Sequence, residues 1–96
     1  MAEVRLIARI VALEGKEDEL KELLRRMVKP TRAEKGCRFY ELFESSNLGI
    51  LYFNELWESR EALDAHMASS HFTEIFGKAK ELFKEPPELN LLQEIQ

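Results

Sequence analysis

Apolar residues recur along the chain with two different periods, and the order of these periods predicts the fold. In the first run, Val4 to Leu13, alternate positions form one continuous apolar face. The opposite face mixes Arg5 and Arg9 with aliphatic residues, so this run predicts a strand that is covered on both sides. Glu14-Gly15 predicts a turn at its end.

The segment after this turn predicts an amphipathic helix. Its apolar residues fall at i, i+3, i+4, i+7 and i+8, namely Leu20, Leu23, Leu24, Met27 and Val28. Acidic residues 17–19 lie in the expected first turn, where they complement the helix dipole. Pro30 is expected to interrupt or kink the helix, and Gly36 is expected to end it.

Two strands joined by a hairpin turn are predicted next. The strands are Cys37–Glu44 and Ile50–Trp57, and the turn is Ser45–Gly49, whose residues tolerate left-handed conformations. The second strand has two distinct faces because side chains alternate along a strand. One face carries Leu51, Phe53, Glu55 and Trp57, and the other carries Ile50, Tyr52, Asn54 and Leu56.

The remaining chain predicts two helices and a final strand. Ser59 is expected to cap a short helix, REALDAHM, and Ser70 is expected to cap the next helix. That helix has an apolar stripe at Phe72, Ile75, Phe76, Ala79, Leu82 and Phe83. Pro86-Pro87 is expected to end it, and residues 89–95 predict the last strand.

The order β-α-β-β-α-β predicts one α+β domain, residues 1–96, with a ferredoxin-like fold and an antiparallel sheet. The helices of such a fold cover one face of the sheet. Because the strands are apolar on both faces, a bare second face is unfavourable in water. The sequence therefore predicts a homodimer packed sheet to sheet, as a dimeric α+β barrel.

Composition narrows the classes of partner and compartment. The 96 residues carry a net charge of −4, with basic and acidic residues interleaved, which argues against nucleic acid as a partner. No run is long and apolar enough for a membrane span, and no signal-peptide pattern is present. With a single cysteine, Cys37, no intramolecular disulfide is possible, so a reducing, cytoplasmic location is expected.

The chain offers few groups for chemistry. His66 and His71 are the only histidines, and five residues correspond to about 140° around one helix. One helix would not aim both at one ion, so no metal site is expected. The sequence contains no glycine-rich phosphate loop and no nucleophile elbow. Cys37 lies in a predicted strand and is interpreted as an inert thiol.

Glu55 stands out as a carboxylate within an otherwise apolar strand. It requires a hydrogen-bond partner, or its pKa rises. One interpretation is an ion pair with Arg9 or Arg38 from a neighbouring strand, and the other is a functional carboxylate. Core packing and a pocket wall are likewise both open for Tyr40, Trp57, His66 and Phe72, and His71 has exposure to solvent as its alternative.

The block ELWESREALDAHMASSHF, residues 55–72, resembles the antibiotic biosynthesis monooxygenase family. The resemblance lies in Glu-x-Trp, Glu-Ala-Leu-x-x-His and Ser-x-His-Phe, and it extends to residues 4–15 and 31–42. This family includes quinol monooxygenases of the dimeric α+β barrel type. The resemblance implies oxidation of quinol-type or anthrone-type aromatics by O2, with no flavin, haem or metal cofactor.

The resemblance also implies roles for individual residues. His66 is the expected proton acceptor, because the pKa of an imidazole suits that role. Trp57 is expected to contact the ring system and to donate its N–H to a substrate oxygen. Asn54 and Tyr40 are assigned to orienting that oxygen from chemistry and strand position alone. The expected substrate-binding residues are Tyr40, Asn54, Glu55, His71 and Phe72.

Three related functions are weighed against this one. Haem-degrading relatives carry an Asn on the first strand, where this chain has Ala8, so that function is disfavoured. A relative that processes a phosphorylated quorum-signal sugar would need a cationic pocket, which Arg9 and Arg38 could supply. A non-catalytic binding or stress-response barrel would have a filled core, with His66 bonded to backbone. The monooxygenase instead predicts an apolar pocket with His66 and Trp57 on its wall.

Overall fold

A computed structural model describes residues 3–96, and its elements follow the predicted order. They are β1 (Val4–Val11), α1 (Glu17–Arg32), β2 (Cys37–Glu44), β3 (Ile50–Trp57), α2 (Arg60–Met67), α3 (Ser70–Ala79), the 3-10 turn η1 (Lys80–Leu82) and β4 (Glu88–Leu92). The strands form one antiparallel sheet in the order β2-β3-β1-β4. The ferredoxin-like α+β fold is therefore confirmed.

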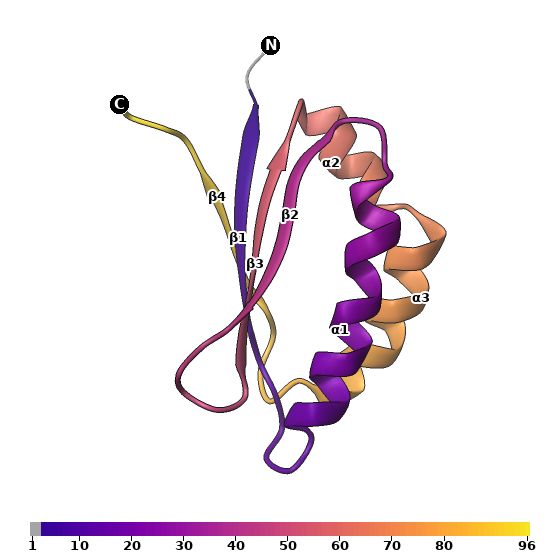
Figure 1. Ribbon diagram of the computed structural model, residues 1–96, viewed down its shortest axis with the longest axis vertical. Helices are drawn as coiled ribbons and strands as arrows, with labels where there is room; N and C mark the ends of the chain where they lie inside the picture. The colour runs from indigo at the N-terminus through magenta and orange to yellow at the C-terminus, as the bar shows by residue number, and fades with distance from the viewer. Residues whose placement is uncertain (1–2) are drawn as a thin grey trace.

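All three α-helices cover the same face of the sheet, and the other face is open (Figure 1). The core lies between the sheet and the helices. Its strand residues include Leu6, Ala8, Ile10, Leu51, Phe53 and Trp57, and its α1 residues include Leu20, Leu24 and Met27. Each large apolar side chain buried in this layer contributes roughly 1.5–3 kcal/mol.

The open face of the sheet is made of the alternate strand residues. Phe39 and Phe43 on β2 are each 52% exposed, and Leu92 on β4 is 49% exposed. Tyr52 pairs with Phe43 in the β2–β3 register, so it lies on this face, whereas its neighbour Leu51 is buried under the helices. The two faces of β3 are thus assigned, which the sequence pattern alone left open.

Two helix ends differ from the prediction. Helix α1 includes Pro30 and continues to Arg32, so Gly36 lies beyond its end. Pro30 cannot donate a hydrogen bond to the preceding turn, but the buried side chains of Met27 and Thr31 hold this last turn in the core. Gly36 instead has φ +91° and reverses the chain between α1 and β2.

The C-terminal elements also shift by a few residues. Ser69, rather than Ser70, caps α3, because its Oγ accepts a hydrogen bond from the Phe72 N–H. Helix α3 ends at Ala79 and passes into η1 before it reaches Pro86. The last strand begins at Glu88 and ends at Leu92.

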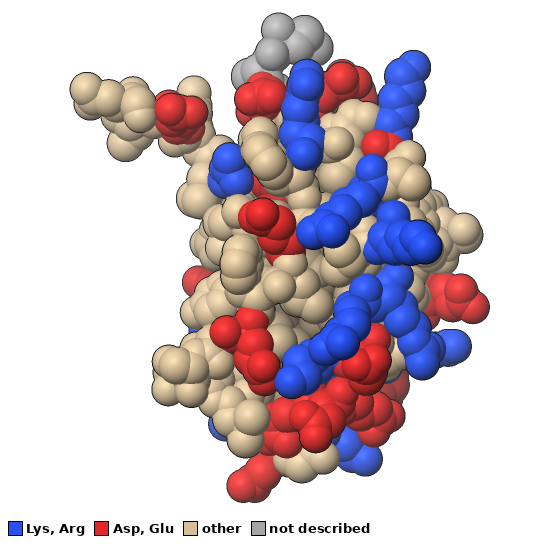
Figure 2. All heavy atoms as spheres, viewed as in Figure 1, with Lys and Arg blue, Asp and Glu red and all other residues tan. Residues whose placement is uncertain are grey.

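Charged side chains of both signs share the face seen in Figure 2. Among the charged side chains of residues 3–96, ion pairs include Lys21 with Glu44 at 3.2 Å and Arg60 with Asp64 at 3.1 Å. The absence of a nucleic-acid partner stays a prediction. Within residues 3–96, none of the helices combines the length and the apolar character that crossing a membrane requires.

Candidate active site

An apolar cavity of about 200 Å³ lies between the covered face of the sheet and helices α2 and α3. It is lined by Leu6, Ala8, Tyr40, Phe53, Glu55, His66, Met67, Phe72, Phe76, Pro87 and Leu89. This lining, all within the described chain, includes no Lys or Arg. Glu55 and His66 are its only titratable groups apart from Tyr40. A concave apolar site with a few polar groups is typical of a small-molecule pocket.

The cavity adjoins a shallower surface groove. Phe72, Phe76 and Pro87 belong to the linings of both, so these three residues separate the cavity from the groove. The basic residues Lys80 and Lys84 lie in the groove and not in the cavity. The cavity and the groove therefore meet at the aromatic rings of α3.

His66 reaches the cavity wall from the last turn of α2. Its Nδ1 lies 2.7 Å from Glu34 Oε2, and its side chain is fully buried. Within residues 3–96, the other ring nitrogen, Nε2, is buried and has no hydrogen-bond partner. Burial lowers the pKa of His66 below its usual value, although the bond and charge of Glu34 oppose this. At neutral pH the imidazole is therefore neutral.

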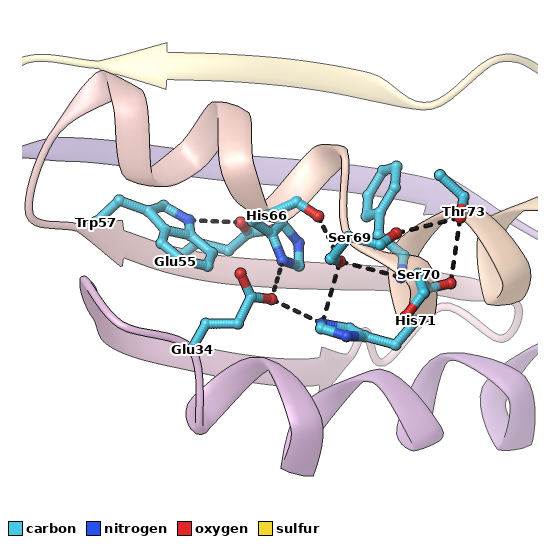
Figure 3. A network of polar contacts seen from close by, with 9 residues as sticks. Glu34, Glu55, Trp57, His66, Ser69, Ser70, His71 and Thr73 are labelled. Atoms are coloured by element: carbon cyan, nitrogen blue, oxygen red, sulfur yellow. Dashed lines mark hydrogen bonds and ion pairs between the residues drawn. The ribbon is translucent and has the colours of Figure 1, made fainter.

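Glu34 joins both histidines (Figure 3). Its Oε2 also lies 2.7 Å from His71 Nε2, at the first turn of α3. The sequence argument against convergence assumed one helix, and it fails because the chain breaks between α2 and α3. Glu34 itself was missed, since nothing in the local pattern of residues 31–42 marks a carboxylate in a turn as functional.

Gly36 brings Glu34 to this position. A Cβ added at Gly36 would lie 2.7 Å from the Ala62 Cβ, so the turn after α1 approaches α2 as closely as a glycine permits. The Gly36 carbonyl also accepts a hydrogen bond of 2.8 Å from the Glu58 N–H, just before α2. Together these contacts fix Glu34 beside His66.

Glu55 has an unexpected partner. Its Oε1 accepts a 2.9 Å hydrogen bond from Trp57 Nε1, and both side chains are buried. Arg9 instead pairs with Glu85, and Arg38 pairs with Glu3 and Glu58, so the predicted arginine partner of Glu55 is wrong. Burial raises the pKa of Glu55 to about 7, although the Trp57 bond opposes the shift.

Comparisons with known proteins identify the family of this chain. The family model described as "Antibiotic biosynthesis monooxygenase" matches residues 3–78. The chain belongs to the antibiotic biosynthesis monooxygenase family. "Putative monooxygenase Rv0793" of Mycobacterium tuberculosis is 39% identical over 89 residues, covering 93% of this chain and 88% of the relative.

Two solved structures show how closely the fold of this monooxygenase-family chain follows its relatives. Rv0793 from Mycobacterium tuberculosis superposes with a TM-score of 0.93 at 37% identity, covering 99% of this chain and 97% of the other. PA3566 from Pseudomonas aeruginosa superposes with a TM-score of 0.93 at 29% identity, covering 100% and 97%.

The site residues expected of a family member fall into two groups. Tyr40, Glu55, His66 and Phe72 line the cavity. Trp57 does not line it, and its N–H is already donated to Glu55, so it is not free to reach a substrate oxygen. Its ring instead packs 4.7 Å from the His66 ring and supports that side chain.

Asn54 lies on the open face of the sheet, away from the cavity. Its Oδ1 accepts a 2.7 Å hydrogen bond from Arg5, and its Nδ2 donates one of 3.0 Å to Glu41. Asn54 does not line this cavity, because it neighbours Glu55 in the strand and must point the opposite way. Its role in orienting a substrate stays a prediction.

Burial also shifts the pKa values of Tyr40 and Cys37, which lie near the site. Burial raises the pKa of Tyr40, so its hydroxyl stays protonated at the cavity wall. Burial, with the charges of Glu34 and Glu55, raises the pKa of the Cys37 thiol to about 11, which does not suit a nucleophile. Glu34, His66 and His71 carry atoms that could bind a metal ion, and these atoms lie within 4.8 Å of one another. The distances of 2.7 Å from Glu34 Oε2 to His66 Nδ1 and to His71 Nε2 are, however, ordinary lengths for hydrogen bonds.

Proposed function

We propose that this protein is a cofactor-independent monooxygenase that oxidises a quinol-type aromatic with O2. The observation that carries the proposal is the buried His66 Nε2, which has no partner in residues 3–96 and belongs to a residue on the wall of an apolar cavity. A buried polar atom without a partner is costly, so its retention in a pocket favours a role with a ligand.

The chemistry begins with a proton transfer. The substrate O–H bond breaks, an N–H bond forms at His66 Nε2, and the electron pair stays on the substrate oxygen. The resulting anion is electron-rich enough to reduce O2 without a cofactor. Overall, one oxygen atom enters the ring and the other leaves as water, with the two hydrogen atoms that the substrate loses.

Glu55 takes the donor role that the sequence suggested for Trp57. With a pKa of about 7 its carboxyl is largely protonated in mildly acidic solution and about half protonated at neutral pH, so its protonated form can donate a hydrogen bond to a substrate oxygen in the cavity. Tyr40, whose pKa is also raised, lines the same cavity. A neutral base and neutral donors together suit a dry pocket.

The size of the cavity narrows the substrate class. An apolar cavity of about 150 Å³ holds one benzene molecule, and this one measures about 200 Å³. A quinol of one or two rings therefore fits better than a three-ring anthrone. Phe72 and Phe76 offer faces for aromatic packing.

The two alternative functions lack support in this cavity. A phosphorylated sugar would bring a dianion into a lining without Lys or Arg, where a charge is poorly solvated. A non-catalytic barrel predicts a filled core and His66 bonded to backbone. Instead a cavity is present, and the ring of His66 contacts the Glu34 carboxylate.

A homodimer and a cytoplasmic location belong to the same proposal. Phe39, Phe43 and Leu92 on the open face are each about half exposed, and a second copy packed sheet to sheet would cover them. The protonated thiol of Cys37, the only cysteine, suits a reducing compartment.

The test is oxygen uptake by the metal-stripped protein with benzohydroquinones, naphthohydroquinones and anthrones. We expect uptake above the uncatalysed rate for one-ring or two-ring quinols, falling roughly 10²–10⁴-fold in His66→Ala. Asp64→Ala, an exposed change on the same helix, is the matched control and should keep full activity. No uptake with any substrate, or equal uptake by wild type and His66→Ala, contradicts the proposal.

A further inference from the structure

We propose that Glu34, held in place by His71, is the positioning residue that keeps the His66 proton on Nδ1 and so presents the Nε2 lone pair to the cavity. The inference rests on the proposed function, in which His66 is the base. Neither Glu34 nor His71 lines the cavity, and their role would be exerted entirely through His66.

The hydrogen-bond partners decide where the His66 proton lies. An ionised carboxylate accepts hydrogen bonds and cannot donate them. The 2.7 Å contact between Glu34 Oε2 and His66 Nδ1 therefore requires an N–H at Nδ1. A neutral imidazole has only one N–H, so Nε2 carries the lone pair. The short distance is typical of a charge-assisted hydrogen bond.

The hydrogen bonds of Ser69 determine which ring nitrogen of His71 carries the proton. Its hydroxyl donates to the His66 carbonyl at 2.6 Å, so its only proton is in use. Toward His71 Nε2, 3.3 Å away, Ser69 Oγ can only accept. Nε2 of His71 therefore carries a proton, which it also donates to Glu34 Oε2 at 2.7 Å. One carboxylate oxygen thus accepts two N–H bonds, and its position is fixed from both sides.

The contact between Glu34 and His66 also stabilises His66 after it has accepted the substrate proton. When the substrate O–H breaks and its proton moves to Nε2, His66 becomes a buried cation with a proton on each ring nitrogen. The Glu34 carboxylate, 2.7 Å from Nδ1, then stabilises that cation where burial alone would disfavour it. The Nε2–H bond later breaks as the proton passes to the reduced oxygen that leaves as water.

The matched control is Glu58, which lies beside the same turn. Its carboxylate would be 3.4 Å from a Cβ at Gly36, and it pairs with Arg38 rather than with a histidine. Glu58→Gln removes a charge near Glu34 without changing either histidine contact. Glu34→Leu removes the acceptor, and Glu34→Gln keeps the shape and an acceptor oxygen but removes the charge.

The first measurement is the ring-nitrogen NMR spectrum at pH 8, which is simple because the chain has only two histidines. We expect His66 as the Nδ1–H form and His71 as the Nε2–H form in wild type and in Glu58→Gln. In Glu34→Leu, His66 should shift toward the Nε2–H form. A wild-type His66 in the Nε2–H form overturns the inference, whatever the activity.

The second measurement is quinol oxidation by the same variants. We expect kcat to fall roughly 100-fold in Glu34→Leu and less in Glu34→Gln, with KM nearly unchanged, since Glu34 does not touch substrate. The pKa of His66 should also fall in Glu34→Leu. Unchanged kcat in Glu34→Leu overturns the positioning role. The expected NMR forms without turnover in wild type support the pair and contradict the proposed function alone.

Discussion

The two faces of β3 place neighbouring polar residues in different environments. On the covered face, Glu55 and Trp57 bond to each other in the core, and the pKa of Glu55 rises to about 7. On the open face, Asn54 is held between Arg5 and Glu41 in a half-buried polar network. The same strand therefore lines an apolar cavity on one side and contributes to a mixed polar and apolar open face on the other.

The difference teaches that burial, rather than residue type, decides which polar groups become chemically useful. Glu41, on the open face, accepts a hydrogen bond from the Asn54 side-chain amide and is only partly buried. Glu55 is buried and accepts one hydrogen bond, from Trp57 Nε1. Burial raises the pKa of Glu55 to about 7, so this carboxyl can act as a proton donor near neutral pH. Substitutions on the two faces of β3 should therefore differ in their effects on stability, assembly and turnover.

The largest expected effect comes from placing a charge on each face in turn. Leu51→Asp puts a carboxylate into the buried core and should cost more than about 4 kcal/mol of stability, so the chain unfolds. Tyr52→Asp, one residue on, should leave a folded chain that sediments as a monomer. Circular dichroism and sedimentation distinguish the two. A dimeric mass for Tyr52→Asp would contradict an interface on the open face.

The next effect is the pH dependence that Glu55 imposes on folding. Its pKa in the folded chain is raised to about 7 from 4.5, so its ionisation opposes folding as pH rises through that interval. Relative to Glu55→Gln, wild type should lose about 3 kcal/mol of unfolding free energy between pH 4.5 and pH 7. Urea unfolding of both proteins at several pH values measures this, and parallel curves would show that Glu55 is not desolvated.

A smaller loss is expected from Gly36→Ala. Residue 36 has φ +91°, and an added Cβ would lie 2.7 Å from the Ala62 Cβ, so the turn must move. We expect a cost of about 2 kcal/mol, together with loss of the Glu34 contact to His66. Thermal unfolding and the His66 ring-nitrogen spectrum report the two effects separately. A normal His66 spectrum in Gly36→Ala would show that the turn is more tolerant than its geometry implies.

The smallest effect on turnover is expected from Asn54→Ala. The side chain lies on the open face, so kcat with a quinol should stay within about twofold of wild type, while Glu55→Gln should alter it more. Steady-state oxygen uptake by the two variants compares the faces directly. A large loss of kcat in Asn54→Ala would indicate that the open face of the sheet takes part in the reaction, which contradicts a site in the cavity.

Much of the fold could be predicted because its signals are local. Strands β2 and β3 and helix α2 begin and end at the predicted residues, since turn residues and the Ser59 cap bound them. Pro30 does not interrupt α1, because the burial of Met27 and Thr31 in the same turn compensates for its missing hydrogen bond. Strand alternation separated Asn54 from Glu55, but it could not say which face meets the helices.

Apart from Tyr40, which was named from its chemistry and strand position, the cavity residues that could be predicted lie in one block of sequence. His66 and His71 belong to residues 55–72 and carry the family resemblance. Glu34 lies 32 residues before His66 and 37 before His71, so only the folded chain reveals the contact. The interpretation of Glu55 as the partner of an arginine failed for a different reason. Trp57, two residues away on the same face of β3, donates to Glu55, and Arg9 and Arg38 pair with other carboxylates.

The contact between Gly36 and Ala62 makes two distant positions share one small volume. Gly36 is separated from Glu34 by one residue, and Ala62 from His66 by one helical turn, so the spacing Glu-x-Gly is tied to Ala-x-x-x-His. In homologous chains the sizes at these two positions should vary together, with a larger residue at one tolerated only beside a smaller one at the other. The pair of spacings is then a criterion for recognising, from sequence alone, which chains can hold a carboxylate against that imidazole.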